Sequence, residues 1–136
     1  MRRFLLDSGI MGDFIDHRRE VAERVREARR RGDRIGTCLP VVGELFAGVE
    51  NSQSREKNHQ LLVRALSRIL CWPFDRASAE EFGRLATFLK RTGRPMQQID
   101  IQMAAIALTL GNTTVVNSDT DLAAVPGLTV ENWASS

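Results

Sequence analysis

The sequence has few of the residues that build disulfide frameworks and zinc sites. Its 136 residues include only two cysteines, Cys38 and Cys71, which lie far apart and form no CxxC pair. The two histidines, His17 and His59, lie in polar segments typical of surface residues. We therefore expect two buried thiols in a reducing, cytoplasmic environment, and neither a disulfide scaffold nor a zinc centre.

Long apolar runs are also missing. No uninterrupted apolar segment approaches the roughly 20 residues that a membrane span requires, and the first residues do not resemble a secretion signal. Low-complexity segments and internal repeats are absent too. With 43% hydrophobic residues, a chain of this length buries roughly two-thirds of its unfolded surface on folding. We expect one soluble domain over residues 1–136, with no membrane partner.

Positive charge is unevenly distributed, although the formal net charge is only +2. Seventeen of the 19 basic residues are arginines, and eight of these fall between Arg18 and Arg34. From Thr92 onward the only basic residue is Arg94, against four acids. One face should be cationic and another anionic. The arginine-rich segment is typical of a solvated helix or of a surface that binds RNA phosphates, and both interpretations stay open.

Short apolar segments alternate with longer segments of helical periodicity. Strands are predicted over residues 4–6, 35–39, 69–74, 113–116 and 128–130. Helices are predicted over residues 10–15, 20–31, 40–50, 57–66, 77–91 and 99–110, with Asp75 capping the fifth of these. This order predicts an α/β fold in which a mostly parallel sheet of four to five strands is covered by helices on both faces.

Four carboxylates are expected at one edge of this sheet. Asp7 directly follows the first strand, and Asp119 comes shortly after the fourth. Glu44 and Asp100 lie near the starts of two helices, each in an apolar stretch of sequence. Because ligand sites in open α/β sheets lie beyond the carboxyl ends of the strands, these acids are the candidate functional residues. An acid in such surroundings needs a partner, or its pKa rises.

A hard divalent cation would stabilise these crowded carboxylates. Arg94 is the nearest candidate cation in the sequence, and one arginine does not neutralise four acids. Oxygen ligands without a histidine or cysteine cluster favour Mg²⁺, with Mn²⁺ as a substitute. Such an ion activates water and neutralises charge on a phosphate, so phosphodiester hydrolysis is the reaction these residues favour.

Other chemistries lack their motifs. The sequence contains no GxxxxGK[ST] phosphate loop, no GxGxxG after a strand and no GxSxG nucleophile elbow. A phosphatase with an aspartyl-phosphate intermediate would also begin with an aspartate after its first strand. Such enzymes usually carry a second aspartate two residues later, where this chain has Gly9. This third interpretation therefore ranks below the metal-dependent one.

Five segments of the sequence form a recognisable set of motifs: Phe4 to Gly9, Gly43 to Gly48, Gly93 to Ala105, Val116 to Leu122 and Val125 to Trp133. Together they resemble the PIN-domain ribonucleases, and more narrowly the VapC toxins of bacterial toxin–antitoxin pairs. The resemblance extends over essentially the whole chain, with the motifs in the family's order and at its spacing.

The resemblance implies a PIN-like three-layer α/β/α sandwich with Mg²⁺-dependent endoribonuclease activity. Asp7 and Asp100 match the two principal metal-ligand positions, and Glu44 matches the third acid. Asp119 best matches the fourth position, with Asp121 as a second candidate. Family members usually form homodimers and are neutralised by a VapB-type antitoxin, whose C-terminal segment lies in a groove of the toxin. The apolar residues between Val41 and Gly48 are candidates for that groove.

Two departures from the family pattern concern secondary site residues. The first aspartate is usually followed by Thr-Asn or Thr-Ser, where this chain has Ser8 and Gly9. Ser8 keeps a hydroxyl that can orient a water or a phosphate. Asn117 stands where the fourth motif commonly has threonine. These departures leave room for an alternative, a catalytically degenerate PIN-like module that binds RNA or protein. In the nuclease interpretation, Arg94 and the arginines of residues 18–34 bind RNA phosphates.

Overall fold

The computed structural model describes residues 1–118 and 121–134. Within these residues, five strands form one sheet in the order β3-β2-β1-β4-β5, and every neighbouring pair is parallel. The predicted α/β sheet is therefore confirmed, and the described strands are all parallel. The strands are β1 (Arg3–Leu6), β2 (Arg34–Cys38), β3 (Leu70–Trp72), β4 (Thr113–Val116) and β5 (Thr129–Glu131).

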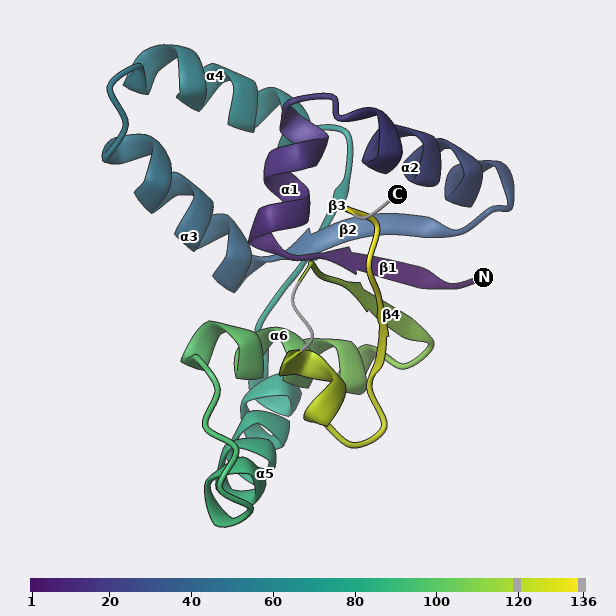
Figure 1. The fold of residues 1–136 in the computed structure, drawn as a ribbon, viewed down its shortest axis with the longest axis vertical. Coiled ribbons are helices and arrows are strands. Elements are labelled where there is room, and N and C mark those ends of the chain that lie inside the picture. Colours follow the sequence, from purple (N-terminus) through teal and green to yellow (C-terminus); the bar gives the residue numbers. More distant parts are fainter. Residues whose placement is uncertain (119–120, 135–136) are drawn as a thin grey trace.

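Helices cover both faces of the sheet and confirm the three-layer arrangement (Figure 1). Figure 1 shows α1 to α4 on one face, where α3 and α4 form a projecting hairpin, and α5 and α6 on the other. The helices are α1 (Ser8–Ile15), α2 (Arg19–Arg30), α3 (Leu39–Glu50), α4 (Arg55–Leu66), α5 (Arg76–Arg91) and α6 (Gln98–Leu110), and a short 3₁₀ helix, η1, spans Asp121–Ala124.

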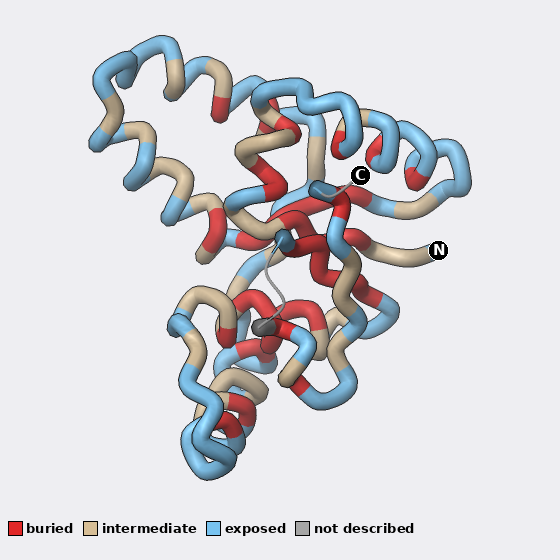
Figure 2. Tube along the Cα trace, in the orientation of Figure 1, coloured by how far each residue is buried: buried red, intermediate tan, exposed pale blue. Residues whose placement is uncertain are grey.

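The core lies on both faces of the central strands. Figure 2 shows the buried residues concentrated in the sheet and on the inner sides of the helices. All four residues of β4 are buried, as are residues 4–6 of β1. Such continuous burial is typical of parallel strands between two helical layers. The described helices include none that is both long and apolar enough to span a membrane.

Proline and capping residues set several element boundaries. The strand predicted over 69–74 is shorter, because Pro73 follows Trp72 and has no N–H for the sheet. The predicted cap is confirmed: the Asp75 carboxylate accepts a hydrogen bond of 2.9 Å from the Ser78 amide. Cys38 is buried as predicted, but the prediction for Cys71 was wrong: it is exposed, since β3 is an edge strand.

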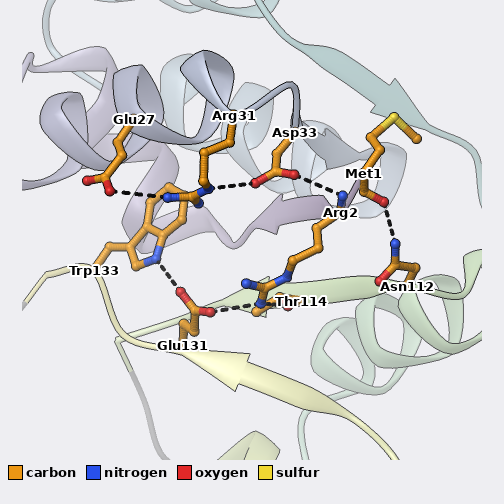
Figure 3. A network of polar contacts seen from close by, with 9 residues as sticks. All are labelled: Met1, Arg2, Glu27, Arg31, Asp33, Asn112, Thr114, Glu131 and Trp133. Carbon is orange, nitrogen blue, oxygen red and sulfur yellow. Dashed lines mark hydrogen bonds and ion pairs between the residues drawn. The ribbon is translucent and has the colours of Figure 1, made fainter.

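A network of polar contacts fastens the C-terminal segment to the sheet (Figure 3). The Arg2 guanidinium donates to Thr114 Oγ1 at 2.6 Å and to the Glu131 carboxylate at 2.9 Å. The Trp133 indole N–H donates to the other Glu131 oxygen at 3.0 Å. The buried Trp133 ring lies 5.1 Å from the Phe4 ring, centre to centre. Trp133 is therefore a packing residue.

Gly36 in β2 is a position where a side chain has no space. A Cβ there would lie 2.8 Å from the Leu70 carbonyl oxygen and 2.8 Å from a ring carbon of Trp72. We expect Gly36→Ala to lower the free energy of unfolding by about 1–3 kcal/mol, because strand β3 must shift to admit the methyl group. Urea denaturation measures the loss. Gly83→Ala on α5 is the control, since a Cβ there meets nothing within 4 Å. It should stabilise by about 0.5–1 kcal/mol, and equal losses for both variants would contradict the close approach.

Candidate active site

Asp7 is held at the junction of β1 and α1. Its backbone N–H donates to the Val116 carbonyl at 3.0 Å, which places it beside the carboxyl end of β4. Its carboxylate caps α1 by accepting a hydrogen bond of 2.8 Å from the Ile10 amide. The side chain is half-buried, and its backbone position is fixed by two elements. Asp7 is therefore a rigidly placed acid at the carboxyl edge of the sheet.

Glu44 and Asp100 lie close enough to Asp7 to repel it. Burial, the largest cause, and the charges of Asp100, Glu44 and Asp13 together raise the pKa of Asp7 to about 6, against the opposing hydrogen bond from the Ile10 amide. Asp100 lies in the first turn of α6 and is half-buried. The structure thus brings together three of the four acids that the sequence singled out.

Glu44 is more exposed than its apolar neighbours in the sequence suggested. Only Val41 of α3 is fully buried, so this helix rests on the domain rather than inside it. Glu44 is exposed, and Leu45, Gly48 and Val49 line a surface groove beside it, whereas Val41 belongs to the core. Only the exposure of Glu44 differs from the expectation, because the periodicity of a short apolar stretch does not tell a core face from a groove wall.

Asn117 and Ser8 lie beside Asp7 on the neighbouring strand and helix. Asn117 directly follows β4 and is buried, and its backbone N–H donates to the Glu131 carbonyl at 2.9 Å. Ser8 is the first residue of α1 and is half-buried. Both secondary candidates therefore stand at the same edge of the sheet as Asp7.

Ser118 is a neighbour of Asp7 that the sequence analysis missed. A Cβ built on Gly9 would lie 3.4 Å from Ser118 Oγ and 3.7 Å from Asp7 Oδ1. Gly9 therefore leaves open a space that the Ser118 hydroxyl and the Asp7 carboxylate share. The only signal in the sequence was the position of Ser118 between two candidates, Asn117 and Asp119.

The structure describes only some of the remaining predicted site residues. Asp119 lies outside the described residues, and so does the side chain of Asp121, whose backbone begins η1. Arg94 is exposed in the loop between α5 and α6, where its backbone N–H donates to the Leu89 carbonyl at 2.9 Å. The choice between Asp119 and Asp121 as the fourth acid stays a prediction.

The donor groups at this edge fit a hard divalent cation. In residues 1–118 and 121–134, no three His, Cys, Asp or Glu side chains are already grouped around a metal position. The acids that do approach one another, Asp7, Glu44 and Asp100, offer oxygen donors only. Mutual repulsion of half-buried carboxylates is relieved when a cation binds between them, and oxygen donors match Mg²⁺ or Mn²⁺.

A largely apolar groove of about 360 Å³ runs from this edge between α1, α3 and α4. Ile15, Leu45, Val49 and Leu61 form apolar parts of its walls. Glu44 also lines it, so the groove adjoins the carboxylates. A segment bound in this groove would lie against one of the three acids.

The raised pKa of Asp7 predicts an unusual dependence of stability on pH. The unfolded chain releases this proton near pH 3.8 and the folded chain near pH 6. The folded state therefore holds more protons in this window, and stability falls as pH rises through it. Without divalent metal, we expect this group to make the protein about 1 kcal/mol less stable at pH 7 than at pH 5. Urea denaturation at both pH values, with Asp7→Asn as reference, measures the difference. An identical pH dependence in both proteins would contradict it.

Comparison with known proteins places this fold and site in a family. The family model of the PIN domain matches residues 4–128, which include Asp7, Glu44 and Asp100. The chain therefore belongs to the PIN-domain family.

Within this family the chain is of the VapC type. It is 30% identical over 134 residues to the tRNA(fMet)-specific endonuclease VapC of Shigella flexneri, covering 98% of this chain and 100% of that protein. It is 27% identical to Ribonuclease VapC2 of Haemophilus influenzae, covering 98% and 99%. In the crystal structure of VapBC2 from Rickettsia felis bound to a promoter DNA fragment, one chain matches with a TM-score of 0.90 and 26% identity, covering 96% of this chain and 98% of that one. The predicted family is confirmed.

Proposed function

We propose that this protein is a metal-dependent endoribonuclease that hydrolyses RNA phosphodiester bonds with Mg²⁺, or Mn²⁺ as a substitute. The observation that carries the proposal is the approach of Asp7, Glu44 and Asp100 at the carboxyl edge of a PIN-domain sheet. The names of the similar proteins, endonuclease and ribonuclease, support the same reaction.

The chain's own residues take distinct roles in this proposal. Asp7 and Asp100 would hold the metal ion, and Glu44 and Asp119 would complete the acidic site, with Asp121 as the alternative fourth acid. When bound, the ion would supply an activated water and neutralise charge that develops on the phosphate. Ser8 and Asn117 orient ligands at the site through hydrogen bonds, and Arg94 binds a phosphate of the RNA.

The apolar groove is the proposed docking site for a VapB-type antitoxin. The similar structures include VapBC complexes, in which a VapC-type chain is crystallised with its VapB partner. A partner segment in the groove would bury its apolar walls and cover Glu44, which lines it. Neutralisation would then follow from blocking the metal site. From the family resemblance, we also propose that the protein forms a homodimer and that it acts in the cytoplasm.

Incubation of the purified protein with total RNA tests the nuclease activity. We expect RNA fragments in buffer with Mg²⁺ or Mn²⁺ and none in EDTA, because the carboxylates alone neither activate water nor neutralise the phosphate. Sequencing of the new RNA ends identifies the cleaved bond. RNA that binds equally well with or without Mg²⁺ and is never shortened would contradict the proposal and favour the degenerate binding module.

Calorimetry provides a readout that does not depend on activity. Uptake of Mg²⁺ or Mn²⁺ at neutral pH is expected for the native chain and lost in Asp7→Asn. The absence of uptake in the native chain would contradict the assignment of these acids as metal ligands.

A further inference from the structure

A polar pocket of about 350 Å³ lies at the opposite edge of the sheet from the carboxylates. Three arginines from separate elements line it. Arg29 is in the last turn of α2, Arg34 is the first residue of β2, and Arg68 lies in the turn between α4 and β3. The tertiary structure thus brings two arginines of the arginine-rich segment to a third that lies more than 30 residues away in the sequence.

Each of these arginines is held by a partner that carries no negative charge. The Arg29 guanidinium donates to the backbone carbonyl of Arg68. The guanidinium carbon of Arg68 lies 5.1 Å from the centre of the Phe14 ring. Arg34 Nε lies 3.0 Å from the sulfur of Met1. Within the described part of the chain, none of the three forms an ion pair with a carboxylate, so their positive charges stay available for a ligand.

The acid that lines this pocket is already engaged elsewhere. Figure 3 shows Asp33 between Arg31 and the backbone of Arg2. Its carboxylate accepts hydrogen bonds of 3.0 Å from the Arg2 amide and 3.2 Å from the Arg31 guanidinium. The Arg2 amide, together with Arg31, holds the pKa of Asp33 below its ordinary value. Asp33 is therefore paired with Arg2 and Arg31, and among the described residues it forms no ion pair with the three arginines of the pocket.

We propose that the pocket of Arg29, Arg34 and Arg68 binds a backbone phosphate of the RNA, remote from the bond that is cleaved. The inference rests on the proposed function, because it assumes an RNA ligand. Guanidinium groups donate paired hydrogen bonds that match the oxygens of a phosphate, and several together favour a polyanion over a single carboxylate.

The position of the pocket favours an RNA that extends beyond the cleaved bond. Strand β2 runs from Arg34 at the pocket to Cys38 at the carboxyl edge, and four steps at about 3.3 Å per residue separate the two ends by about 13 Å. An RNA that fills only the cleavage site does not reach so far, whereas an RNA that continues a few nucleotides beyond it, such as a tRNA, can contact both edges. The pocket would therefore contribute to binding through the RNA backbone rather than through base sequence.

Binding of unfractionated tRNA in EDTA tests the pocket without requiring cleavage. For Arg29→Gln combined with Arg34→Gln, we expect about tenfold weaker binding at 0.15 M salt. The slope of log affinity against log salt should become shallower by about one unit, since roughly 0.7–0.9 of a unit belongs to each phosphate contact. In Mg²⁺, KM for tRNA cleavage should rise by a similar factor while kcat stays within about twofold. Thermal unfolding of each variant verifies the fold.

Arg84→Gln combined with Arg91→Gln is the matched control. It removes the same charge from α5 in the opposite layer, and Arg91, like Arg29, lies in the last helical turn. We expect its tRNA affinity to stay within about twofold of the native value. Equal losses in both double variants would overturn the proposal, because they would reflect net charge alone. The proposal would also be overturned if Arg29→Gln combined with Arg34→Gln left the tRNA affinity unchanged but weakened the binding of inorganic phosphate or of an acidic peptide. That result would assign the pocket to another anion. Failure of the native protein to cleave RNA would count against the proposed function and leave this binding result interpretable.

Discussion

Asp7→Asn is expected to reduce RNA cleavage by about a thousandfold or more, which corresponds to about 4 kcal/mol of transition-state stabilisation. The substitution removes the negative charge of the half-buried acid while an amide oxygen stays in place to cap α1 through the Ile10 amide. Stability at pH 7 in EDTA should not fall, because the neutral side chain is no longer repelled by Asp100 and Glu44. Cleavage of labelled RNA and urea denaturation measure the two effects.

Asp75→Asn is the matched control for this substitution. Asp75 also follows a strand and caps a helix, accepting a hydrogen bond of 2.9 Å from the Ser78 amide. It shares the structural role of Asp7 without its acidic neighbours, so its cleavage rate should stay within about twofold of the native rate. Full activity of Asp7→Asn would contradict a catalytic role for the negative charge of Asp7. An equal loss of activity in both variants would indicate an effect of the altered helix cap instead.

Leu61→Asp is expected to release the protein from its antitoxin. Leu61 lines the apolar groove, and a carboxylate there would be buried without a partner once the groove is filled. We expect the affinity for the VapB-type partner to fall by about a hundredfold or more, or about 2.7 kcal/mol. RNA cleavage without antitoxin should stay within about twofold. Titration of the cleavage reaction with antitoxin measures both effects.

Val63→Asp provides the control on the same helix. Val63 is 45% exposed and does not line the groove, so the same charge there should leave neutralisation unchanged. If Leu61→Asp is neutralised as readily as the native protein, the antitoxin binds elsewhere and the groove has another role.

The order of the elements was predictable because apolar runs and helical periodicity are local properties of the chain. The strand around Phe4 and the apolar helix α6 follow directly from hydrophobic patterning. The hydrophobic pattern predicted too long a strand for β3, because Pro73 ends the pairing of this strand with β2 after Trp72. It also predicted burial for Cys71, whose strand lies at the edge of the sheet. Strand order depends on contacts between distant segments, which a local pattern does not contain.

The sequence predicted only those site residues that can be identified from their position relative to a strand or helix. Asp7 was singled out because it follows a buried strand, and Asp100 because it interrupts an apolar helix. Ser118 was missed, since its proximity to Asp7 depends on how β4 ends beside α1 and on the missing side chain of Gly9. The exposure of Glu44 was missed too, because it depends on how α3 rests on the domain.

Residue identity alone determined which donors this protein offers: carboxylates without a histidine or cysteine cluster, and positive charge carried almost wholly by arginine. Tertiary structure decided where they act. Parallel pairing of β1 with β4 brings Asp7 beside the segment that follows Val116. The turn after α4 brings Arg68 to Arg29 and Arg34 at the other edge. The reason is physical: side-chain chemistry is a property of each residue, whereas repulsion, burial and binding depend on distances that exist only once the sheet has formed.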